Sequence, residues 1–187
     1  IVDCGITDPA TIAAWEQVFA TELDGLPVLR VLVTHMHPDH MGLAHWLTQR
    51  WSTRESECRL WISATDHFAA RLASTRTTSF GGDTAAAHFI RHGMVDPVSI
   101  AKVRARSSYY SSMVPAVPER FRRLMDGNRV RIGDHEWRCH AGYGHAPEHI
   151  ALHSPTLNTL ISGDMVLPRI STNVMVIDLE PEADPLT

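Results

Sequence analysis

The apolar residues in the first part of the chain follow two different periods. After Asp8 and Pro9, four large apolar residues recur at helical spacing: Ile12, Trp15, Phe19 and Leu23. Aspartate followed by proline is typical of a helix N-terminus, so this segment predicts an amphipathic helix that packs one face on a sheet. Residues 28–33 are almost all apolar and predict a buried strand, and residues 58–62 predict a second one.

Helical patterns follow both predicted strands. The first runs from residue 42 to about residue 50, and the second runs from Asp66 to about Ala73. Because strand and helix alternate along this part of the chain, we predict one layered α/β unit.

The pattern changes between about residues 74 and 126. Residues 75–82 are small and polar and predict a loop. A helix is predicted over residues 83–92, where a glycine follows it, and another is predicted to begin at Asp96-Pro97. The serine- and tyrosine-rich residues 107–112 interrupt the helical pattern again.

From residue 129 onward the apolar positions alternate with a period of two. Two such segments flank the Gly133-Asp134 turn and predict a hairpin. Residues 149–153 and 159–162 predict a second pair of strands. His145 follows the first pair and Asp164 follows the second, so each pair ends beside a residue that can bind a metal.

Length and charge narrow the classes of function. A chain of 187 residues can form one domain with a substantial core, and 44% apolar and 20% charged residues are ordinary for a globular protein. The net charge of −4 disfavours a nucleic-acid partner. Arg120, Arg122 and Arg123 could form a local basic patch, but we interpret them as the solvated face of a helix.

The cysteines, the lengths of the apolar runs and the first residue lead to three further expectations. Cys4, Cys58 and Cys139 are odd in number and lack zinc-like spacing, so we expect reduced thiols, which favours the cytoplasm. No run approaches the roughly 20 apolar residues of a membrane span, so no membrane partner is expected. Ile1 lies inside a predicted strand without a preceding Met, and we expect the chain to begin within a longer fold.

The highest density of possible metal ligands lies at residues 35–40, His-Met-His-Pro-Asp-His. These residues leave the carboxyl end of the predicted strand 28–33, where ligand sites of layered α/β folds gather. Neutral imidazoles and carboxylates are zinc ligands, and their alternating spacing lets neighbouring side chains point to two separate ions. The segment therefore predicts a metal site rather than a polar turn whose histidines are solvated.

This His-x-His-x-Asp-His pattern resembles the signature of the metallo-β-lactamase fold, and the chain is similar to the glyoxalase II-like branch of that family. Asp3, His145 and Asp164 match three further motifs in the family's order. The resemblance implies an α/β (α+β) fold, the αββα sandwich, incomplete here at both ends. Residues 1–187 would form a single partial domain with a helical insert at about 74–126.

By the same resemblance the insert lies beside the substrate pocket. Arg104, Arg106, Tyr109 and Tyr110 are candidates for substrate contact there, although helical packing and solvated charge explain them equally well.

Carried over residue by residue, the resemblance implies two metal ions, zinc by default, with iron, manganese or cobalt acceptable to the same ligands. His35, His37 and His145 would hold one ion. Asp39 and His40 would hold the other, and Asp164 would bridge the two. Ions about 3.5–4 Å apart share a water and lower its pKa, so that hydroxide becomes the nucleophile.

Residues around these expected ligands are assigned supporting roles by the same resemblance. Asp39 would accept a hydrogen bond from the attacking water and is the expected catalytic residue. Asp3 would orient a ligand from outside the metal sphere, and His149 would support the site.

Three departures from the family pattern stand out. Tyr143 replaces the usual proline before the third-motif histidine, and Glu148 replaces a glycine, so the pocket could be reshaped. The family's last metal histidine follows the bridging aspartate, yet no histidine follows His153. We therefore expect a fragment that lacks both ends of the fold and is weakly active or inactive by itself.

The function implied is a metal-dependent hydrolase of a small thioester, ester or lactone, glyoxalase II-like. A phosphodiesterase or ribonuclease relative of the same fold is an alternative, which the acidic balance disfavours. A non-catalytic metal-binding or interaction domain is the other alternative, because one expected ligand is missing. The expected partner is a small-molecule substrate.

Overall fold

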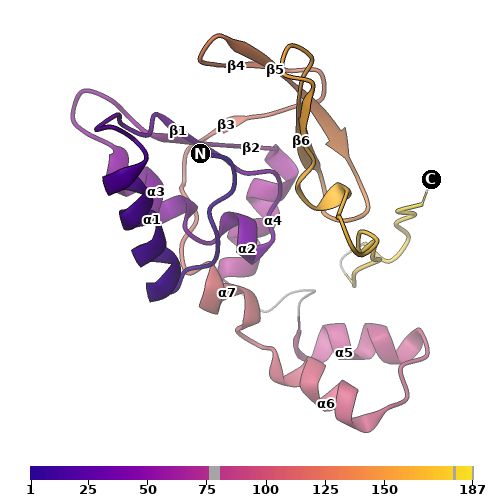
Figure 1. Cartoon of the computed structure of the whole chain (residues 1–187). Helices are drawn as coiled ribbons and strands as arrows, with labels where there is room; N and C mark the ends of the chain where they lie inside the picture. The colour runs from indigo at the N-terminus through magenta and orange to yellow at the C-terminus, as the bar shows by residue number, and fades with distance from the viewer. Residues whose placement is uncertain (76–80, 179, 187) are drawn as a thin grey trace.

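The computed structural model describes residues 1–187 except 76–80, 179 and 187. Two sheets face each other, and helices cover the outer face of the first sheet (Figure 1). The first sheet is parallel, with the order β1 (Arg30–Leu32), β2 (Arg59–Ile62) and β3 (Phe121–Arg123). The predicted strands over 28–33 and 58–62 are thus confirmed, in shorter form.

The second sheet is antiparallel and meanders in chain order. Its strands are β4 (Arg129–Ile132), β5 (His135–Gly142), β6 (His149–Ser154) and β7 (Thr159–Ile161). Both predicted strand pairs are confirmed, including the turn at Gly133, whose φ of 59° suits glycine.

The helices of the first part of the chain are α1 (Pro9–Thr21), α2 (Pro38–Met41), α3 (Ala44–Trp51) and α4 (Ala64–Thr75). The Asp8 side chain accepts hydrogen bonds from the amides of Ala10 and Thr11, which confirms the predicted N-cap of α1. The predicted apolar face of α1 is only partly buried and meets aromatic residues of α3; the Phe19 ring lies 5.1 Å from the Trp51 ring.

Three helices follow: α5 (Gly82–Arg91), α6 (Pro97–Ala105) and α7 (Tyr109–Met113). The predicted helices at 83–92 and from Asp96-Pro97 are confirmed. The predicted interruption at 107–112 is confirmed only in its first two residues, because α6 ends at Ala105 and α7 begins at Tyr109. Figure 1 shows α5 and α6 as a pair that projects away from both sheets. Most of the loop predicted over 75–82 lies outside the described residues.

Strand β3 was not predicted. It pairs with β2 through Leu60 and Phe121, so the arginines at 120–123 do not form a helix face. Arg122 instead lies over the Trp61 ring, 4.2 Å from its centroid. A three-residue strand has too short an apolar pattern to be distinguished from a loop.

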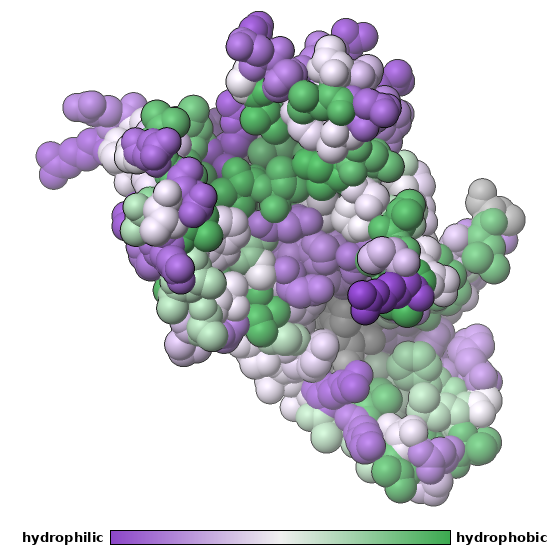
Figure 2. Space-filling model, in the orientation of Figure 1, coloured by the Kyte–Doolittle hydropathy of each residue, from purple (hydrophilic) through white to green (hydrophobic). Residues whose placement is uncertain are grey.

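The core has two parts, one on each face of the first sheet. Val31 and Val33 point toward the helices, whereas Leu32 packs with residues of the second sheet such as Trp137 and Ile150. Since both faces of β1 are covered, its apolar run has no polar alternation. Figure 2 shows hydrophobic residues gathered where the two sheets face each other and hydrophilic residues beside α2.

The three cysteines are buried and free. Within the described ranges, no helix is both long and apolar enough to cross a bilayer.

Candidate metal centre

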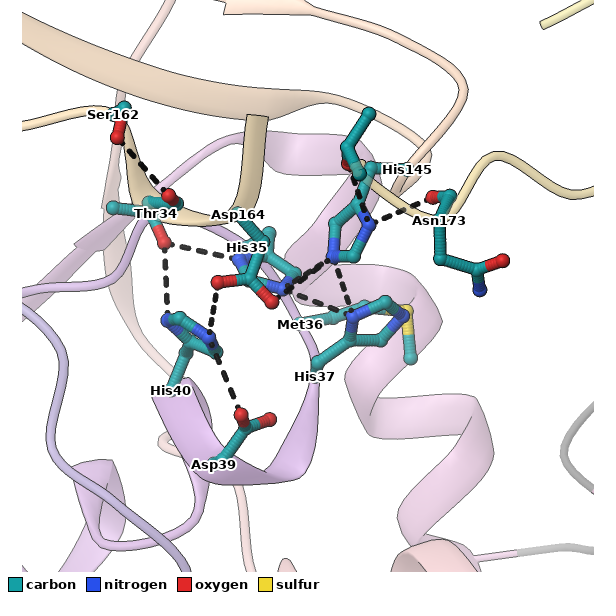
Figure 3. A network of polar contacts seen from close by, with 12 residues as sticks. Thr34, His35, Met36, His37, Asp39, His40, His145, Ser162, Asp164 and Asn173 are labelled. Carbon is teal, nitrogen blue, oxygen red and sulfur yellow. Dashed lines mark hydrogen bonds and ion pairs between the residues drawn. The ribbon is translucent and has the colours of Figure 1, made fainter. Parts of the chain in front are cut away.

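The sequence-predicted site residues come from three segments that meet at one edge of the two sheets (Figure 3). His35 and His37 lie between β1 and α2, and His40 lies within α2. His145 lies in the loop between β5 and β6, and Asp164 lies in a short 3-10 helix, η1 (Gly163–Met165). The motif was predicted on a loop, but its last three residues, from Pro38 to His40, form the start of α2.

Three ring nitrogens of one group converge within 3.2 Å of one another. His37 Nδ1 lies 2.9 Å from His35 Nε2 and 3.0 Å from His145 Nε2, and the two Nε2 atoms are 3.2 Å apart. Three nitrogens held by one tetrahedral zinc at 2.0–2.1 Å would lie about 3.4 Å apart. The triangle formed by His35, His37 and His145, here called the triad, thus has nearly the size that a zinc ion requires.

The outer hydrogen bonds of the triad fix where its protons lie. The Thr34 hydroxyl donates to Asp3 Oδ2 at 2.9 Å, so it must accept from His35 Nδ1–H at 3.0 Å. His145 Nδ1–H donates to the carbonyl of Asn173 at 2.8 Å, because a carbonyl can only accept. In neutral imidazoles, both Nε2 atoms then carry lone pairs.

With both rings neutral, these two lone pairs would face each other across 3.2 Å and would form no hydrogen bond. Burial lowers the pKa of His35 far below its ordinary value, and the neighbouring His37 and His40 lower it further. Burial likewise lowers the pKa of His37 to about 4. The rings of His35 and His37 are therefore neutral near pH 7, and neutral imidazoles have lone pairs that can bind a cation.

A second group comprises His35, His40 and Asp164, whose possible ligand atoms lie within 4.8 Å of one another. Asp164 Oδ1 is 3.3 Å from His40 Nε2, and Asp164 Oδ2 is 3.5 Å from His145 Nε2. One carboxylate thus directs one oxygen toward each group, as a bridging position between two cations requires.

Asp3 fixes the orientation of the His40 ring in this second group. Its Oδ1 accepts the backbone N–H of Thr34 at 2.8 Å, and its Oδ2 accepts His40 Nδ1–H at 2.8 Å. His40 Nε2 therefore faces Asp164 and Asp39. Burial opposes the protonation of His40, but its hydrogen bonds to Asp3 and Asp39 outweigh that effect and raise its pKa to about 10.

Asp39 is not brought into either group. Its side chain is 68% exposed, and its Oδ2 lies 3.5 Å from His40 Nε2. The hydrogen bond to His40 holds the pKa of Asp39 below its ordinary value, so it is a carboxylate at neutral pH. Its position at the solvent side of the site leaves oxygen atoms available to a water or substrate.

Asp66 is the residue that sequence reasoning missed. Its buried carboxylate accepts the amide N–H of Met36 at 2.7 Å and the amide N–H of Glu148 at 2.6 Å. It thereby ties the segment of His35 and His37 to the segment of His145. The sequence signal was ambiguous, because a serine three residues before an acidic residue is typical of a helix cap.

The structure shows where two of the three departures from the family pattern, Glu148 and Tyr143, lie. Glu148 Oε2 accepts the Thr65 hydroxyl at 2.8 Å, so this carboxylate binds α4 rather than the histidines. Tyr143 is 64% exposed and lines a pocket of about 770 Å³ that also includes His37 and His145.

The insert residues proposed for substrate contact lie elsewhere. Tyr110 is buried, and its hydroxyl donates to the Met36 carbonyl at 2.6 Å, which supports the motif from behind. Arg104 pairs with Asp83 on the surface, and Arg106 lies over the Tyr109 ring. None of these four residues is among the described residues that line the pocket.

His149 and Gly163 close the back of the site. The His149 ring is fully buried and stacks on His35, with ring centroids 4.9 Å apart. Burial lowers the pKa of His149 to about 4, so it packs as a neutral ring. A Cβ at Gly163, whose φ is 49°, would collide with His149 Nε2, so glycine is required there.

Comparisons with known proteins agree with this fold. The family model of the metallo-beta-lactamase superfamily matches residues 1–185. A beta-lactamase domain protein from Burkholderia ambifaria is 54% identical, with a TM-score of 0.86, over 99% of this chain and 50% of that one. A metallo-beta-lactamase family protein from Thermus thermophilus is 23% identical, with a TM-score of 0.64, over 96% of this chain and 55% of that one.

A third solved structure shows the same fold at lower similarity. It is the protein TTHA1623, solved in a di-iron-bound form, which is 22% identical with a TM-score of 0.52, over 89% of this chain and 61% of that one. No curated protein sequence matches the chain. The chain spans about half the length of the first two solved structures, 50% and 55%.

Proposed function

The chain belongs to the metallo-beta-lactamase superfamily, and from this premise we propose that the protein is a metal-dependent hydrolase of a small thioester, ester or lactone. Glyoxalase II-like thioester hydrolysis is the form of this activity that we favour. The observation that carries the proposal is the triad, in which three ring nitrogens converge within 3.2 Å of one another.

The proposed cofactor is zinc, in two ions. The triad would hold one, and His40 and Asp164, together with Asp39, would hold the other. When bound there, divalent ions would lower the pKa of a water toward neutrality and would polarise a carbonyl, so no serine or cysteine nucleophile would be needed. Zinc is favoured because the ligand set is imidazole and carboxylate, which iron and manganese also accept.

Residues of the chain would orient the histidine ligands and the attacking water. Asp3 and Thr34 fix the rings of His40 and His35, so that each presents one nitrogen to the site. The exposed carboxylate of Asp39 can accept a hydrogen bond from a water molecule and orient that water toward a substrate carbonyl.

The free, buried thiols support a reducing compartment, and we propose the cytoplasm. The acidic net charge supports a small-molecule substrate over a nucleic acid.

The test combines metal content with hydrolysis. Mass spectrometry of protein purified with added zinc should show bound zinc in wild type and its loss in His37→Ala, with zinc affinity lowered about 100-fold or more. His92→Ala is the matched control, because His92 is exposed and lies outside both groups. It should bind zinc like wild type.

Hydrolysis is then measured on a thioester, a carboxylic ester, a lactone and a phosphodiester. Cleavage of one of the first three that depends on zinc and His37 is expected. Zinc binding without cleavage of any of the four would instead support a non-catalytic metal-binding domain. Preferential cleavage of the phosphodiester would support the phosphodiesterase alternative.

A further inference from the structure

A pocket lies beside the triad and is lined by three segments of the chain. Its volume of about 770 Å³ lies within the range of small-molecule sites. One wall is α4, the second is the loop from Tyr143 to Pro147, and the third is the segment that contains Met175 and Ile177. Because His37 and His145 belong to the lining, whatever occupies this pocket lies against the triad.

Large apolar side chains in this lining remain partly exposed to solvent. Phe68 is 62% exposed, Leu72 is 44% exposed and Tyr143 is 64% exposed. Phe68 and Leu72 are four residues apart on α4 and so share one face, whereas His67 and Ala70 of the same helix are buried in the core. Helix α4 thus presents a second apolar face to the pocket.

The charges of the lining are all of one sign. Apart from the histidines, the charged side chains among the described lining residues are Glu180 and Asp184, and these residues include no lysine or arginine. An anionic group beside Glu180 and Asp184 would meet like charge and would find no lysine or arginine among the described lining residues. An uncharged apolar chain would instead cover Phe68 and Leu72 and release the water around them.

We propose that this pocket binds an uncharged, apolar acyl chain, so that the substrates are fatty-acyl-type thioesters, esters or lactones rather than those with charged acyl groups. This inference rests on the proposed hydrolase function, and it adds the chemical class of the substrate. Phe68 and Leu72 are then residues that determine chain-length specificity.

The first experiment measures kcat/KM on thioesters whose straight acyl chain grows from two to ten carbons. Each methylene that becomes buried should raise kcat/KM about fourfold until the pocket is full. An acyl chain of eight carbons that ends in a carboxylate should react at least about tenfold more slowly than octanoyl. Equal rates for all chain lengths, or faster cleavage of the carboxylate chain, would overturn the inference.

Substitutions test which residues determine the preference for long acyl chains. Phe68→Ala should lower the ratio of octanoyl to acetyl kcat/KM about tenfold, and because Phe68 is largely exposed, the core should be unaffected. Val98→Ala is the matched control: Val98 is 61% exposed on α6 and is not among the described lining residues, so the ratio should not change. A ratio unchanged in Phe68→Ala would exclude this wall as the acyl site.

A binding measurement separates failure of this inference from failure of the hydrolase proposal. Methyl resonances of Leu72 and Met175 are followed in NMR spectra while n-alkanols of four to ten carbons are added. Affinity that rises about fourfold per methylene, and falls in Phe68→Ala, supports the apolar pocket even if no substrate is cleaved. Absent shifts, or shifts independent of chain length, would show that the pocket does not take apolar chains.

Discussion

The two ligand groups of the site share His35 but differ in how they are prepared for a cation. In the triad, burial keeps His35 and His37 neutral, and the nitrogens already lie within 3.2 Å of one another. In the second group, two carboxylates keep a proton on His40, whose pKa is raised to about 10, and the nearest oxygen of Asp164 lies 3.3 Å away.

The difference teaches that burial and carboxylates act in opposite directions on a histidine ligand. Burial removes the proton and leaves a lone pair facing the site. A neighbouring carboxylate retains the proton, which a metal must displace before it can bind. We therefore expect the triad to bind its ion first and more tightly.

The largest effect is expected on turnover when Asp39 is changed. Asp39→Asn should lower kcat about 100-fold, because the amide cannot accept the proton of the attacking water. Since Asp39 lies outside the triad, the first zinc equivalent should bind as in wild type, and the melting temperature should change little. Steady-state kinetics, zinc titration and thermal unfolding measure the three quantities. Wild-type kcat in this variant would show that Asp39 has no catalytic role.

Asp66 tests whether the triad depends on support from outside it. Asp66→Asn leaves one side-chain N–H facing a backbone N–H, so either the Met36 or the Glu148 amide loses its acceptor. Zinc affinity of the triad should fall about 10- to 100-fold, as measured by competition with a chelator.

Asp96→Asn provides the matched control for this change. Asp96 also accepts two backbone amides, but it does so at the exposed N-terminus of α6, remote from the histidines. This variant should bind zinc like wild type. Equal zinc affinities in Asp66→Asn and Asp96→Asn would mean that Asp66 does not position the triad.

The smallest effect per step is expected from pH, which should change zinc affinity by a different amount per unit in the two groups. Zinc binding at the second group must displace the His40 proton, so its affinity should rise with pH, by up to about tenfold per unit, and level off near pH 10. His37 has a pKa of about 4, so it should add no pH dependence to triad affinity above about pH 6. Zinc titrations at pH 6, 7 and 8 that gave parallel slopes for both equivalents would contradict the comparison.

Local signals in the sequence were sufficient for most of the secondary structure. The N-caps at Asp8 and Asp96, the buried strand before His35 and the turn at Gly133 each depend on residues a few positions apart. Such signals act through backbone dihedral angles and nearby hydrogen bonds, which the chain carries wherever it folds. The short elements β3 and α7 were missed because neighbours distant in the sequence stabilise them.

The motif at residues 35–40 also predicted a metal site by itself, since three histidines and an aspartate so close together are typical of such a site. The arrangement of the site depended on the tertiary structure. Only folding brings His145 to within 3.0 Å of His37, 108 positions away. Only folding joins the amides of Met36 and Glu148 through the buried carboxylate of Asp66. Burial, which removes the proton from His37, is a property of the packed chain and cannot be read from residue order.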